Sequence, residues 1–271
     1  MKLFFILCLI FLSSCSPRFA NEYYAPDEGN MLTLSQKKDL NFSGSVPSSV
    51  ILGDDNFEQF NFQLGYSPIK HLGIFSSYFN YSNKGYTLSK DSKIKLPSLA
   101  IGGYYLIQSK KQKIRSDTTN NLPAGVLLDL YSGYGKGQLT NNFEDGGNST
   151  LDFHKYFIQG GIHWQDEIVG INTTYKFGGT NYFQGIINGP FTDEDNKNLR
   201  NIVDNNTFLF REFSFKFYVG ARGFRTYAGF TNLNFFDKNP FNHRKQIRYL
   251  GIVFDIDTLY KIIKNKEKIT F

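Results

Sequence analysis

The most constraining feature of this sequence is a strict alternation of apolar and polar residues within short segments. In one of them, Phe60, Phe62, Leu64 and Tyr66 occupy every second position. A strand places such residues on one face, whereas a helix would scatter them around its circumference. The chain has 28 Phe and 17 Tyr, yet its mean hydropathy is negative. Apolar and polar groups are therefore interleaved, which predicts strands with one apolar face and one polar face.

The same pattern recurs along the chain and predicts ten strands. The candidate strands are 39–46, 60–66, 72–81, 96–107, 124–136, 151–165, 169–177, 213–219, 223–235 and 246–256. After Phe254, Leu259, Ile262 and Ile263 fall on one side of a short helical tail among lysines.

The connections between these strands alternate in length. The second, sixth and eighth strands are followed by tight turns, whereas 82–95, 137–150 and 178–206 are longer and polar. Short turns at one end and long loops at the other are typical of a transmembrane β-barrel. We therefore predict an all-β fold, an antiparallel up-and-down barrel of about ten strands. The connection 108–123 is long where a short turn is expected, so the strand count is uncertain by one pair.

The amino-terminal residues predict an exported chain. Lys2 precedes ten apolar residues, 3–12, too few to span a bilayer as a helix but typical of a signal peptide. Leu12-Ser13-Ser14-Cys15 resembles the bacterial lipobox. The resemblance implies cleavage before Cys15 and acylation of that residue, and two or more acyl chains hold a protein stably on a membrane. An ordinary signal peptide cleaved nearby is the alternative.

These boundaries predict a signal peptide over 1–14, a lipidated tether over 15–38, and a barrel domain with its tail over 39–271. Cys8 would be lost with the leader and Cys15 capped, so the mature chain would have no thiol for disulfides, catalysis or metal binding.

Two further stretches carry a family resemblance. They are Tyr24-Ala25-Pro26, with Leu32, Leu34 and 37–40 after it, and the hairpin from Phe62 to Ile74. Together they resemble an uncharacterised family of lipobox-bearing outer-membrane β-barrel lipoproteins of Gram-negative bacteria. The resemblance implies the barrel fold and no particular activity.

The parity of the strands selects residues that face the lumen. The inward candidates are Gln63, Asp129, Lys155, Gln159, His163, Lys176, Glu212 and Lys216. Charges of both signs in a narrow lumen are expected to pair, because an unpaired buried charge is costly. One interpretation is a selective pore or a polar ligand pocket. The other is an interior filled by its own side chains, as in barrels of about eight strands.

Catalytic and metal-binding patterns are weak. His154 and His163 lie on opposite faces of one strand, while His71 and His243 fall in connections, so no catalytic site is predicted. Residues 193–198 have oxygen ligands at spacings partly like a calcium loop, but Lys197 stands where a ligand is needed. We predict a solvated loop there, with no metal and no cofactor.

The functional prediction follows from export and fold. The net charge of +6 lies in clusters, and nucleic acid is an implausible partner for an exported chain. We expect a lipid-anchored outer-membrane barrel with a structural, adhesive or complex-forming role, not an enzyme, whose partners are outer-membrane lipid and an envelope protein. The alternatives are a lipid-tethered soluble β-sandwich that binds glycan or another envelope component, and a barrel enzyme acting on envelope lipid.

The expected topology follows from the even strand number. An even number of strands returns both termini to the short-turn end, which is periplasmic in outer-membrane barrels. Residues 16–19 after Cys15 lack an acidic sorting signal, which also favours the periplasmic side.

Overall fold

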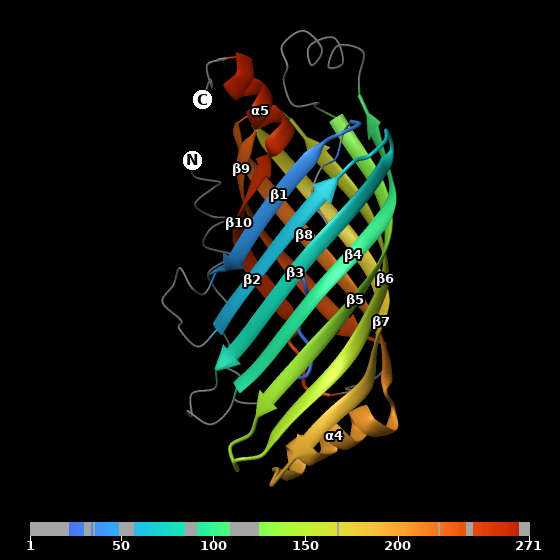
Figure 1. Cartoon of the computed structure of the whole chain (residues 1–271), viewed down its shortest axis with the longest axis vertical. Coiled ribbons are helices and arrows are strands. Elements are labelled where there is room, and N and C mark those ends of the chain that lie inside the picture. Colours follow the sequence, from blue (N-terminus) through green and yellow to red (C-terminus); the bar gives the residue numbers. More distant parts are fainter. Residues whose placement is uncertain are drawn as a thin grey trace.

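The computed structural model describes residues 22–29, 34, 36–48, 57–84, 91–108, 125–166, 168–221, 223–236 and 241–265. The expected signal peptide, Cys15 and most of the connection 108–123 lie outside these residues. Within them, ten strands form a closed barrel (Figure 1). The strands are β1 (Leu40–Pro47), β2 (Phe57–Tyr66), β3 (Leu72–Lys84), β4 (Asp91–Ile107), β5 (Gly125–Asn142), β6 (Asn148–Gln165), β7 (Val169–Asn188), β8 (Thr207–Ala221), β9 (Phe224–Phe235) and β10 (Gln246–Asp255).

Each strand pairs antiparallel with its sequence neighbours, and β1 closes the barrel on β10. At the seam, Phe42 of β1 lies opposite Phe254 of β10 and, on its other side, opposite Leu64 of β2. The predicted up-and-down barrel of ten strands is confirmed. A closed barrel excludes the β-sandwich alternative, because a sandwich consists of two separate sheets packed face to face.

The outer surface carries a band of apolar side chains. Phe60, Phe62, Leu64 and Tyr66 are each between 41 and 44% exposed, which confirms that this face of β2 points outward. On β6 the band runs from Trp164 to Tyr156. Eight residues at about 3.3 Å each, with strands tilted by about 40°, give a band about 20 Å tall.

Beyond this band the polarity of the wall is reversed. On β5 the outward residues change from Leu130 and Tyr134 to Lys136 and Gln138, while the inward Leu139 is fully buried. The expected loops 82–95, 137–150 and 178–206 were therefore too long. The polar outward residues belong to strand extensions, and the hairpin joining β5 to β6 has only residues 143–147 between its strands.

The segment between β7 and β8 contains a helix, α4 (Asp193–Asp204), instead of the expected solvated loop. Thr192 caps it by accepting a hydrogen bond from the backbone N–H of Asp195, and three acidic residues fill its first turn. Leu199 and Ile202 are buried. Helix α4 lies at the end of the barrel where the longer connections of the sequence analysis fall, here called the loop end, at the bottom of Figure 1.

A second helix, α5 (Ile256–Asn265), follows β10 at the opposite end, where the short turns lie and which is here called the turn end (Figure 1). This agrees with the predicted helical tail. Among the described residues, neither helix has the length and apolar character needed to cross a bilayer.

The interior of the barrel is filled. A large cluster of buried apolar residues fills the loop-end part and extends to Tyr218 and Tyr227 near the turn end. A smaller cluster around Phe75, Tyr131 and Phe157 lies in the turn-end part. The larger cluster includes Tyr23 and Tyr24, which precede the first strand. Residues Glu22–Gly29, here called the inner segment, are all buried within the barrel. The interpretation of 15–38 as a tether outside the fold is wrong for these residues.

Candidate functional site in the barrel lumen

All eight residues that parity assigned to the lumen are buried in the structure. The exposed fraction is at most 2% for seven of them and 8% for Asp129. They come from β2 (Gln63), β5 (Asp129), β6 (Lys155, Gln159 and His163), β7 (Lys176) and β8 (Glu212 and Lys216). Outward neighbours such as Tyr156 and Phe213 are exposed. The alternation therefore separates an apolar exterior from a charged interior.

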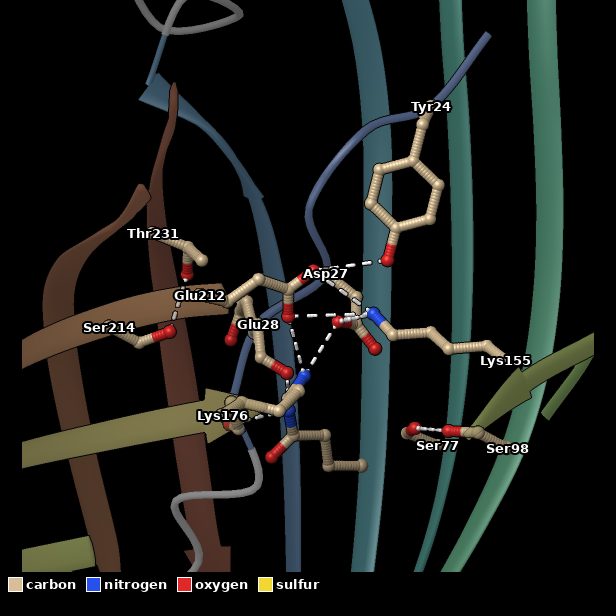
Figure 2. A network of polar contacts seen from close by, with 12 residues as sticks. Tyr24, Asp27, Glu28, Ser77, Ser98, Lys155, Lys176, Glu212, Ser214 and Thr231 are labelled. Atoms are coloured by element: carbon tan, nitrogen blue, oxygen red, sulfur yellow. Dashed lines mark hydrogen bonds and ion pairs between the residues drawn. The ribbon is translucent and has the colours of Figure 1, made fainter. Parts of the chain in front are cut away.

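Four charged groups form the centre of the lumen (Figure 2). The Lys155 ammonium lies 2.6 Å from Asp27 Oδ1 and 3.1 Å from Glu212 Oε1. The Lys176 ammonium lies 2.7 Å from Asp27 Oδ1 and 3.0 Å from Glu212 Oε2. Each lysine thus contacts both carboxylates, and Tyr24 donates a further hydrogen bond to Glu212 at 3.1 Å.

A second cluster surrounds Glu28. The Lys216 ammonium lies 2.8 Å from Glu28 Oε2, and the Tyr227 hydroxyl donates to the same oxygen at 3.2 Å. Ser45 of β1 donates to the other carboxylate oxygen. The side-chain amide of Gln63 donates to the carbonyl of Gly29 at 3.1 Å. The inner segment is therefore bonded to strands on several sides of the barrel.

The inner segment balances the charge of these clusters. The strands contribute three ammonium groups, Lys155, Lys176 and Lys216, but only one carboxylate, Glu212. Asp27 and Glu28 supply the other two carboxylates. Because removing one partner of a buried ion pair leaves a costly uncompensated charge, the segment and the strands are electrostatically interdependent.

Aromatic rings enclose the same lysines. The Lys155 ammonium lies 4.8 Å from the ring centroid of Phe210, and that of Lys176 lies 4.9 Å from Phe157. Lys216 lies 4.7 Å from the ring of Tyr227. Such contacts favour a cation most strongly where water is excluded. The Lys155 ammonium also lies 5.3 Å from the ring centroid of Tyr24, which belongs to the inner segment.

The four histidines make structural contacts. His163 Nε2 lies 2.6 Å from Asp129 Oδ2 inside the barrel, while His154 contacts the Tyr134 hydroxyl on the outside. This confirms that His154 and His163 lie on opposite faces. His71 Nδ1 lies 3.0 Å from the carbonyl of Tyr104, and His243 Nδ1 lies 2.9 Å from that of Phe241. Among the described residues, no group of three or more His, Cys, Asp or Glu side chains could hold a metal ion.

The inner segment is fixed at its loop end. Its Tyr23 N–H donates to the carbonyl of Asn242 at 2.8 Å, and the Arg244 N–H donates to the carbonyl of Tyr24 at 2.8 Å. The Glu22 N–H donates to Ser92 Oγ at 2.9 Å. The first two bonds attach the segment to the connection between β9 and β10, and the third attaches it to β4.

A groove of about 460 Å³ lies on the outer wall rather than in the lumen. It is lined by Tyr156, Phe177, Gly178, Leu209 and Phe236, among other residues. The groove is part of the apolar band.

Asp27, Glu28, Tyr23 and Tyr24 were missed as site residues, because the residues before β1 show no strand periodicity. The strand pattern nevertheless contained an indirect signal. The inward positions that it predicts include three lysines but only two carboxylates, Asp129 and Glu212, and Asp129 pairs with His163. The surplus of inward lysines required acidic groups from outside the strands.

No protein-family model and no curated protein matches this chain. The fold and the lumen define its structural class: an antiparallel ten-stranded barrel that is filled by the residues preceding its first strand.

Proposed function

We propose that this protein is a lipid-anchored outer-membrane β-barrel with a structural, adhesive or complex-forming role in the cell envelope. The observation that carries the proposal is the polarity of the wall, with apolar side chains outside and paired charges inside. A water-soluble barrel would be expected to place its apolar side chains inside and its polar ones outside. A band about 20 Å tall is close to the apolar height of known outer-membrane barrels, about 25 Å.

Aromatic residues at both edges of the band support the membrane assignment. Tyr78, Tyr134 and Tyr156 lie toward the loop end, while Tyr105 and Trp164 lie toward the turn end, and all are at least 40% exposed. Such rings suit the boundary between lipid and water, because they are apolar with a polar edge.

The filled lumen favours a structural or adhesive role over conduction. The clusters around Asp27 and Glu28 join the inner segment to the wall at the level of the apolar band. At the loop end, the extensions of β5 and β6 continue beyond the band and present polar outer surfaces, whereas Phe183 and Ile186 are exposed on the extension of β7. This end is suited to contact an envelope protein or another surface.

The acyl anchor is the second part of the proposal. It rests on the lipobox-like residues Leu12–Cys15, which lie outside the described part of the chain. Acyl chains on Cys15 would add a second membrane attachment to that of the barrel wall.

A lipid-free variant separates the two attachments. Cys15→Ala removes the acylation site, and we expect the protein to remain in the membrane pellet after carbonate washing. It should also migrate differently on gels before and after heating, as intact barrels do. Release by carbonate together with unchanged migration would contradict the membrane-spanning barrel.

Two further measurements test the role. Wild-type protein in planar bilayers should show no stable conductance, because its lumen is filled. Cells lacking the protein should have unchanged lipid A and phospholipid profiles, and altered profiles would favour an enzyme acting on envelope lipid.

A further inference from the structure

The described residues from Glu22 to Lys38 mark a path from one end of the barrel to the other. Glu22 is bonded to Ser92, which pairs with Asn141, seven residues beyond Tyr134 toward the loop end. Asp27 lies between Lys155 and Lys176, deeper in the lumen.

The turn end of the path is marked by later residues. Leu34 is buried beside Phe75 and Tyr131. The Lys38 N–H then donates to the carbonyl of Ser67, in the turn between β2 and β3, at 2.7 Å. The chain therefore enters at the loop end and reaches the turn end before β1 begins.

This path changes the topology that strand number alone implies. The even number of strands does place the start of β1 and the end of β10 at the turn end, where Asp255 is bonded to Gly223. The residues before β1, however, return through the lumen. The first described residue, Glu22, consequently lies at the end of the barrel opposite to α5.

Chain length prevents Cys15 from returning to the turn end. It lies seven positions before Glu22, and a chain of that length spans at most about 25 Å when fully extended. The distance from Ser92 to Tyr104 at the turn end is twelve residues of β4, or about 30 Å along the barrel axis for strands tilted by about 40°. The β1–β10 pairing closes the wall, so no lateral route exists between these strands.

We propose that the chain is threaded through its own barrel, so that acyl chains on Cys15 enter the leaflet at the loop end, on the cell surface. The inference rests on the proposed function, namely that the barrel spans the outer membrane and that Cys15 is acylated. It replaces the periplasmic position expected for the amino terminus. Because two or three acyl chains cannot pass through a filled lumen, the strands must close around the inner segment during assembly.

Single cysteines test this topology in the full-length protein, since the mature wild-type chain is expected to have no free thiol. Asn21→Cys places a thiol directly before the inner segment. Asp145→Cys marks the exposed tip of the β5–β6 hairpin at the loop end, and Lys70→Cys marks the exposed turn between β2 and β3. Intact cells are treated with a membrane-impermeant maleimide, and the labelling is repeated after permeabilisation.

We expect Asn21→Cys and Asp145→Cys to react in intact cells, and Lys70→Cys to react only after permeabilisation. If Asn21→Cys reacted only after permeabilisation, as expected for Lys70→Cys, the threading would be overturned. The contrast between Asp145→Cys and Lys70→Cys would still support the membrane-spanning barrel. If both controls reacted equally in intact and permeabilised cells and the protein were released by carbonate, the proposed function itself would fail. Incorporation of an alkyne-tagged fatty acid, lost in Cys15→Ala, tests the acylation separately.

Discussion

The ammonium group of Lys155 and the carboxylate of Asp27 lie 2.6 Å apart, although 128 residues separate them in the sequence. Lys155 projects inward from β6, whereas Asp27 precedes the first strand. Their contact joins the wall of the barrel to the inner segment. It also makes the position of the inner segment sensitive to single charges.

Asp27→Asn is expected to destabilise the folded protein by about 3–5 kcal/mol, because Lys155 and Lys176 would then share only Glu212. Denaturant unfolding in detergent, followed by the heat-dependent gel shift, measures the change. Asp145→Asn removes the same charge from an exposed hairpin tip and should change the stability by less than about 0.5 kcal/mol.

A second substitution shows whether the loss is electrostatic. Adding Lys155→Met to Asp27→Asn removes one of the two ammonium groups that would otherwise share Glu212, so the double variant should be more stable than the sum of the single effects predicts. Strict additivity would mean that the two side chains do not interact in solution.

Reversing the charges of the inner segment should open the lumen. In the double variant Asp27→Lys and Glu28→Lys, the segment meets Lys155, Lys176 and Lys216 with like charge and should be repelled. We expect ion conductance in planar bilayers, with selectivity for anions because the exposed wall carries these lysines.

The control for this experiment is the double variant Glu144→Lys and Asp145→Lys, which makes the same change in net charge at the exposed β5–β6 tip. It should remain non-conducting. Cation selectivity in the lumen variant, or equal conductance in both variants, would refute the idea that the inner segment closes a cationic lumen.

The alternation of apolar and polar side chains made the barrel predictable. Strand geometry imposes a two-residue period wherever the two faces of a strand lie in different environments. It located all ten strands and all eight lumen candidates. It failed at strand ends such as 137–142, because polar outward residues and three glycines within 133–137 there look like a loop. Only the inward Leu139 and Phe153 reveal that the strands continue.

The inner segment could not be found from periodicity. Tyr23, Tyr24, Asp27 and Glu28 are held by contacts with β1, β6, β7, β8 and β9 and with the connection between β9 and β10. No repeat in their own sequence records such contacts. An irregular chain inside a barrel takes its shape from its surroundings. Glycine at position 29 is one local sign, since a Cβ atom there would clash with Thr174 Oγ1.

The apolar band predicts a contrast between two positions on one face of β5. Leu130 is 61% exposed within the band, and Gln138 lies on the same face beyond it. Leu130→Lys places a charge in the hydrocarbon and should destabilise the protein in phospholipid bilayers by about 2–4 kcal/mol, whereas Gln138→Lys meets water and should change the stability by less than about 1 kcal/mol. Urea-induced unfolding from liposomes measures both variants. Neither side chain faces the lumen. Equal losses of stability in the two variants would therefore mean that the whole outer surface lies in one environment, which would contradict the membrane-spanning assignment.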